Sequence, residues 1–151
     1  MNFPVGQVIA KSALPVNFQT IVSELTKISF NGYLIQTVRG KCVEEGVLFF
    51  REGTLNACIV ECLALNKILK GDEAIDYFLN QTRGNGFFQT VQLTRSQVDL
   101  VTAFDEKLLL ANKINLKDLP KLIPSSFEPK FNIEESKSNL LEEYGLSELR
   151  K

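Results

Sequence analysis

Two apolar runs that meet at a short polar join dominate the pattern of the chain. The runs cover 47–50 and 55–60, and both are rich in β-branched and aromatic residues. The join, Glu52-Gly53, contains a glycine, which tolerates the positive φ that a tight hairpin turn needs. The pattern therefore predicts a β-hairpin at the centre of a small antiparallel sheet. Because consecutive positions are apolar, we expect both strands to be covered on both faces, or covered on one face and bound by a partner on the other.

Apolar positions at spacings of three and four predict helices around this hairpin. The helices are expected over residues 16–28, 71–82 and 95–111. Asn17 is a suitable N-cap for the first helix, because its side chain can accept from the free amides of the first turn. Thr94 and Gln97 have the spacing of a capping box at the start of the third.

Short runs of β-branched and aromatic residues predict further strands over 5–10, 33–38 and 87–93. Together these elements predict one α+β domain over residues 1–112, with packed helices on an antiparallel, meandering sheet of about four to five strands. A proline-broken C-terminal extension follows over 113–151. Within it we expect a short helical turn at 116–123 and a last amphipathic helix at 134–144.

Composition and charge mainly exclude classes of function. The chain has 151 residues and a net charge of −1, and its seventeen basic residues are scattered. Because binding to nucleic acid depends on clustered Lys and Arg, we expect no nucleic-acid partner. No apolar run is long enough to span a membrane, and the first residues lack the pattern of a signal peptide. We therefore expect a cytoplasmic protein.

Candidate chemical groups are few. The chain contains no histidine, the commonest general base and metal ligand. Its three cysteines, Cys42, Cys58 and Cys62, form no CxxC pair, so we expect reduced thiols rather than a disulfide framework. On a strand Cys58 and Cys62 would lie about 13 Å apart, too far to share a metal ion. Cys42 falls in a polar turn, where we expect it to be exposed and where a redox role stays open. We predict no catalytic residue, no cofactor and no metal site.

Two pairs of adjacent phenylalanines are the candidate interaction residues: Phe49 with Phe50, and Phe87 with Phe88. Neighbouring residues on a strand point to opposite faces of the sheet. If helices cover only one face, one ring of each pair joins an exposed apolar patch, which typically marks an interface. If helices cover both faces, all four rings belong to the core.

A series of motifs also resembles a known family. The series is Phe30-x-Gly32-x-Leu34, Gly46-x-Leu48-x-Phe50-x-Glu52-Gly53-x-Leu55-x-Ala57, Gly71-Asp72-Glu73-Ala74-Ile75 and Gly86-Phe87-Phe88. In order and spacing it resembles the PATAN-type domain, a domain of unknown function associated with bacterial response regulators and motility regulators. It is also similar to uncharacterised archaeal proteins. The resemblance covers about residues 16–110, and it implies a non-catalytic domain that mediates protein contacts in signalling, with no catalytic residues to transfer.

Three function hypotheses remain at this point. The first is a non-catalytic regulatory or adaptor domain that binds a protein partner or associates with itself. The alternative is a sensor that binds a small ligand in an apolar pocket between sheet and helices. An enzyme ranks last, because no cluster of polar residues stands at catalytic spacing.

Overall fold

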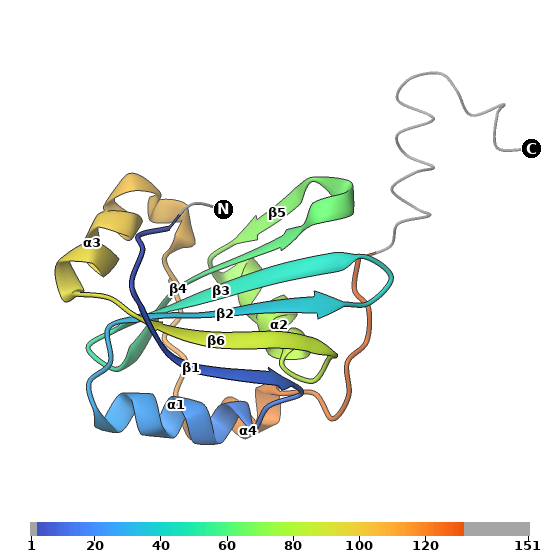
Figure 1. Ribbon diagram of the computed structural model, residues 1–151, viewed down its shortest axis with the longest axis horizontal. Helices are drawn as coiled ribbons and strands as arrows, with labels where there is room; N and C mark the ends of the chain where they lie inside the picture. Colours follow the sequence, from blue (N-terminus) through green and yellow to red (C-terminus); the bar gives the residue numbers. More distant parts are fainter. Residues whose placement is uncertain (1–2, 132–151) are drawn as a thin grey trace, which may run out of the picture.

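A six-stranded antiparallel sheet organises the fold in the computed structural model, which describes residues 3–131 (Figure 1). Its strands lie in the order β1-β6-β2-β3-β4-β5. Their bounds are β1 Gln7–Leu14, β2 Gly32–Arg39, β3 Val43–Arg51, β4 Thr54–Cys62, β5 Lys67–Lys70 and β6 Gly86–Gln92. The predicted α+β class with an antiparallel sheet is confirmed. The additional strand is β5, a segment of four residues that is too short to give a clear alternating pattern.

The central hairpin is also confirmed. Strands β3 and β4 pair in antiparallel register, with Arg51 opposite Thr54 at the turn. Glu52 and Gly53 have φ values of 51° and 76°, so both turn residues adopt the left-handed conformation that matches the twist of a tight hairpin. Residues 47–50 are all fully buried, as expected for a central strand with side chains packed on both faces.

The strand order departs from a simple meander at one point. Strands β2 to β5 follow one another, but β6 inserts between β1 and β2 and pairs with both. Because β1 and β2 are each antiparallel to β6, they run parallel to each other and need a crossover, which helix α1 (Phe18–Lys27) supplies. This arrangement is a split βαβ unit, and it leaves β1 at the edge of the sheet.

Helices pack on both faces of this sheet. Helices α1 and α2 (Asp72–Gln81) contribute to the core on one face, and α3 (Arg95–Phe104) covers part of the other. Figure 1 shows α2 behind the strands and α3 at one end of the sheet. Both predicted caps are present: Asn17 Oδ1 accepts from Thr20 N at 3.2 Å, and Thr94 and Gln97 form the capping box.

The third helix is shorter than the predicted 95–111. It ends at Phe104, and Asp105 caps a 3-10 turn, η2 (Glu106–Leu108), by accepting from Lys107 N at 3.2 Å. Leu108 is buried from this turn rather than from a continuing helix, and Leu109 then forms an isolated bridge with Ala57. The apolar spacing that predicted a longer helix thus reflects burial in two different elements.

The two faces of the sheet carry separate hydrophobic clusters. The larger lies under α1 and α2, and the smaller, which includes Val47, Phe49 and Ile59, lies under α3. The predicted turn in the C-terminal extension is present as the short helix α4 (Leu119–Leu122). A further 3-10 turn, η1 (Leu63–Leu65), follows β4. Leu119 and Phe131 are buried in the larger cluster, so the described part of the extension packs against the domain. The helix predicted at 134–144 lies outside the described residues.

Candidate protein-binding site

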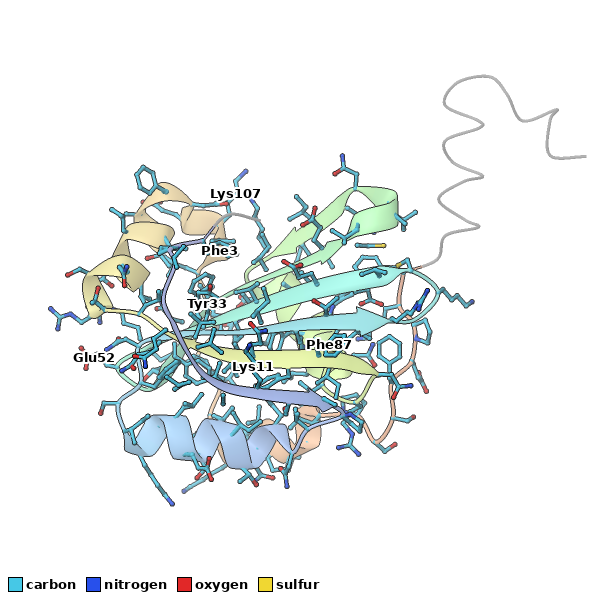
Figure 2. The ribbon with its side chains drawn as sticks, viewed as in Figure 1. Phe3, Lys11, Tyr33, Glu52, Phe87 and Lys107 are labelled. Atoms are coloured by element: carbon cyan, nitrogen blue, oxygen red, sulfur yellow. The ribbon has the colours of Figure 1, made fainter. Side chains whose placement is uncertain are left out.

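Of the four candidate interaction residues, the structure leaves only Phe87 at the surface. Phe49 and Phe50 are fully buried and Phe88 is 3% exposed, because helices cover parts of both faces of the sheet. Phe49 belongs to the cluster under α3, whereas Phe50 and Phe88 belong to the cluster under α1 and α2. Phe87 is 73% exposed on β6 (Figure 2). The four rings therefore do not form one interaction surface.

Strand β1 is the most exposed strand of the sheet. Seven of its eight residues are exposed, and within residues 3–131 it pairs with β6 on one side only. Val8 and Ile9 are each 42% exposed, and Lys11 is its single charged residue (Figure 2). An unpaired strand edge presents a row of free N–H and C=O groups, which is a template for pairing with another chain.

An apolar groove of about 480 Å³ lies between β1 and α1, and we call it the β1–α1 groove. Such a volume is within the range of ligand-binding sites. It is lined by Ile9, Ala10, Lys11 and Ser12 of β1, by Ile21, Glu24 and Leu25 of α1 with Ile28 directly after it, and by Phe88 and Thr90 of β6. Ile28, at the end of α1, is 65% exposed. The free strand edge and an apolar surface thus lie side by side.

A second apolar groove, of about 450 Å³, lies beside α3 on the other face. We call it the α3 groove. It is lined by Phe3, Pro4, Ile59, Leu100, Val101, Phe104, Asp105 and Leu108. Phe104 is 83% exposed and Leu100 is 53% exposed, whereas the ring of Phe3 packs on Phe49 with centroids 4.9 Å apart. The only ionisable side chain in this lining is Asp105, so the groove suits an apolar occupant.

A buried polar network joins the sheet to α2. Gln36 Nε2 donates to the Phe78 carbonyl at 2.8 Å and to Gln81 Oε1 at 3.2 Å, and Gln81 Nε2 donates to Glu44 Oε1 at 3.1 Å. A side chain at Gly46 would collide with Gln81 Oε1, so glycine is needed where α2 approaches β3. Burial raises the pKa of Glu44, and the hydrogen bond from Gln81 opposes this shift. The network lines neither groove, and we assign it a structural role.

The structure agrees with the prediction for Cys58 and Cys62 but differs from it for Cys42. Cys58 and Cys62 lie on one strand, as predicted. The predicted exposure of Cys42 is wrong: it is only 8% exposed, because it packs in the larger core cluster with its Sγ 2.7 Å from the Cys62 Sγ. Among residues 3–131, no group of three or more His, Cys, Asp and Glu side chains has a metal-binding arrangement. In the same part of the chain, no helix has the length and apolarity needed to cross a membrane.

A family model described as "Uncharacterized protein conserved in archaea (DUF2226)" matches residues 1–105. The chain belongs to this family. The match confirms the expected similarity to uncharacterised archaeal proteins, and in this DUF2226 chain it includes every strand of the sheet and the whole β1–α1 groove. No curated protein and no solved structure matches the chain.

Sequence reasoning missed the β1–α1 groove for a physical reason. The apolar spacing over residues 16–28 predicts a helix with one apolar side, and in the structure Phe18, Val22 and Leu25 on that side are buried. Ile21 and Ile28 are more exposed and line the groove together with Leu25. The first helix has more apolar residues than the core covers, and this excess is the sequence signal that could have indicated the groove. It does not show which strand lies beside the helix, because the strand order depends on contacts between distant parts of the chain.

Proposed function

We propose that this protein is a non-catalytic regulatory or adaptor domain that binds an extended segment of a partner protein in the β1–α1 groove. One observation carries this proposal: a long, unpaired strand edge lies next to an apolar groove. A segment laid along β1 would bond its main chain to the free edge and place alternate side chains in the groove. The main-chain bonds would supply affinity, and the groove would select the side chains.

The shape of the site favours an extended peptide over a second copy of the chain. In Figure 1, α1 runs along the outer side of β1, and the two elements form the walls of the same groove. We expect a single strand to fit between these walls, whereas a second sheet would have to approach past α1. Because Ile21, Leu25 and Phe88 line the groove, we expect the bound segment to carry aliphatic side chains at alternate positions.

The family-level resemblance supports the same class of function. The motifs over residues 16–110 that resemble the PATAN-type domain suit a cytoplasmic signalling module that acts through protein contacts. Part of the β1–α1 groove, including the whole of α1, falls within that range. We therefore place the proposed activity in signalling, with binding rather than catalysis as the elementary event.

A peptide selection with matched variants tests this proposal. The immobilised protein is used to select from a phage-displayed library of random peptides, and the selected peptides are titrated against the wild type, Ile28→Glu and Phe104→Glu. Both variants place a carboxylate at an exposed apolar helix position, on opposite faces of the sheet. We expect peptides with alternating aliphatic residues, at least tenfold weaker binding (about 1.4 kcal/mol) to Ile28→Glu, and unchanged binding to Phe104→Glu.

Two results would overturn the proposal. Failure of the library to yield any peptide would remove peptide binding, and equal binding to wild type and Ile28→Glu would remove the groove as the site. Sedimentation of the unliganded protein tests the choice of partner. A dimer that Ile28→Glu dissociates would show that a second copy, and not a peptide, occupies the groove.

The α3 groove supports the alternative function, a sensor for a small apolar ligand. Its volume and its apolar lining are suitable for such a compound. Native mass spectrometry of the purified protein would then show a stoichiometric extra mass, and Leu100→Glu would abolish it while Ile28→Glu would not. A mass equal to that of the protein alone would count against the sensor.

A further inference from the structure

Two cysteines from different elements meet inside the larger core cluster. Cys42 lies in the turn between β2 and β3, and Cys62 is the last residue of β4. Their Sγ atoms are 2.7 Å apart, and the two residues are 8% and 0% exposed. Neither thiol contributes to the β1–α1 groove or the α3 groove.

The register of the sheet explains this proximity. Glu44 of β3 is directly opposite Cys62, and Cys42 precedes Glu44 by two residues. Residues two apart on an extended chain point to the same face, so Cys42 and Cys62 are diagonal neighbours on the face that α1 and α2 cover. A disulfide has an S–S distance of about 2.05 Å, so the two sulfurs need only a small further approach to bond.

We propose that Cys42 and Cys62 form an oxidative modification site, at which a peroxide converts the two thiols into a disulfide that ties the β2–β3 turn to the end of β4. The site is independent of the proposed peptide binding. Cys42 is the more exposed of the two residues, and we assign the first step to it.

The reaction balances with hydrogen peroxide as the only co-reactant. The Cys42 thiolate attacks one peroxide oxygen, the O–O bond breaks, and hydroxide leaves, giving a sulfenic acid on Cys42. The Cys62 sulfur then attacks the Cys42 sulfur, the S–S bond forms, the S–O bond breaks, and the leaving hydroxide takes the Cys62 proton as water. The two thiols lose two electrons and two protons, and the peroxide is reduced to two molecules of water.

The surroundings of the pair predict a slow reaction. Burial raises the pKa of Cys42 to about 12, with further contributions from Cys62 and from Glu44. The thiolate is the reactive form, so little of Cys42 is ready to react near neutral pH. The bond is therefore expected to form over a long exposure and to act as a lasting cross-link rather than as a fast signal.

Cys58 provides a matched control within the same strand. It is fully buried on the same face as Cys62, and the two are four residues apart on β4. At about 3.3 Å per residue they lie roughly 13 Å apart, far beyond the reach of a disulfide. Oxidation should therefore leave Cys58 as a free thiol.

Thiol counting and peptide mapping test the site on the full chain. The reduced protein is exposed to hydrogen peroxide, unfolded, treated with a thiol-alkylating reagent and analysed by mass spectrometry. We expect three alkylated cysteines before oxidation and one afterwards, with the peptide of Cys42 linked to that of Cys62. Three alkylated cysteines after oxidation, a link to Cys58, or a link between two chains would each overturn the inference.

Variants and thermal stability provide the second test. Cys58→Ala should form the bond as the wild type does, whereas Cys42→Ala and Cys62→Ala should each lose it. The cross-link closes a loop between residues 20 apart, which should raise the Tm of the wild type by about 10 °C. An oxidised protein with the linked peptides but an unchanged Tm would contradict the claim that the bond ties the turn to the strand.

Discussion

The two edges of the sheet differ in length, charge and cover. Strand β5 has four residues with a lysine at each end, and both lysines are engaged. Lys70 Nζ donates to Asp105 Oδ2 at 2.5 Å, and Lys67 Nζ lies 6.0 Å from the centroid of the Phe131 ring. Strand β1 has eight residues, a single charge at Lys11 and an apolar groove beside it.

This difference shows which edge is available to another chain. Natural sheets protect their edges with short strands, charged side chains or covering segments, because a bare edge pairs readily with other strands. Edge β5 has the first two forms of protection, since it is short and has a lysine at each end. Edge β1 is twice as long and has a single charged residue, and we therefore propose this edge, rather than β5, as the binding site.

The largest expected effect is a loss of stability when Phe88, which lines the β1–α1 groove, is substituted. Phe88 is buried on β6, is paired with Ser12 of β1, and packs in the larger core cluster. Phe88→Ala should lower the free energy of unfolding by about 3–5 kcal/mol, because it removes a buried ring and leaves a cavity under the edge. Urea denaturation followed by circular dichroism measures this change.

Phe87 supplies the control for that measurement, because it is the neighbour of Phe88 on β6 and is 73% exposed. Phe87→Ala should change the free energy of unfolding by no more than about 0.5 kcal/mol. Equal effects of the two substitutions would mean that the rings are not divided between core and surface in solution.

The same pair of rings shows how far sequence reasoning reaches. Alternation along a strand predicts that Phe87 and Phe88 point to opposite faces, and they do. Which of the two is buried depends on where the helices lie. Helix α3 covers the part of its face near Val47 and Phe49 and leaves Phe87 uncovered, and this is fixed by the connection after β6 rather than by the residues of β6.

Local patterns predicted the elements, and long-range contacts decided the candidate site. The hairpin at Glu52-Gly53 and the caps at Asn17 and Thr94 depend on neighbouring residues, and each is present. The edge position of β1 depends on β6, which lies about eighty residues further along the chain and inserts beside it. Likewise, the contact between Cys42 and Cys62 follows from the register of β3 on β4, which an irregularity between Phe49 and Phe50 shifts by one residue, and the sequence pattern does not specify that irregularity.

A smaller effect on stability is expected from substitutions that give the β1 edge the lysines of the β5 edge. The double variant Val8→Lys, Ile9→Lys gives β1 charges like those of β5. Both positions are partly exposed, so the free energy of unfolding should change little, by about 0.5 kcal/mol per site. Binding of the selected peptides should weaken at least tenfold, because lysines disfavour the approach of an apolar strand.

Fluorescence anisotropy with a labelled selected peptide measures this loss of affinity. Lys67→Gln, at the opposite edge, is the control and should bind the peptide as the wild type does. If the double variant binds normally, the peptide does not pair with β1. If Lys67→Gln also weakens binding, charge at a distance, rather than contact with the edge, controls the affinity.

The smallest expected effect concerns the cover of the β5 edge. Lys70 and Asp105 form a partly exposed ion pair, so Lys70→Met should lower the free energy of unfolding by only about 0.2–1 kcal/mol near neutral pH. The hydrogen bond from Lys70 holds the pKa of Asp105 below its usual range, so the carboxylate binds fewer protons in the folded state than in the unfolded one. Its contribution is therefore present above the unfolded pKa of about 4 and is lost as the pH falls through the lower folded value. Urea titrations should show a difference between wild type and Lys70→Met near neutral pH, and this difference should shrink as Asp105 is protonated in acid. A difference that persists after Asp105 is protonated would come from the methylene stem of Lys70 on β5 and not from its charge.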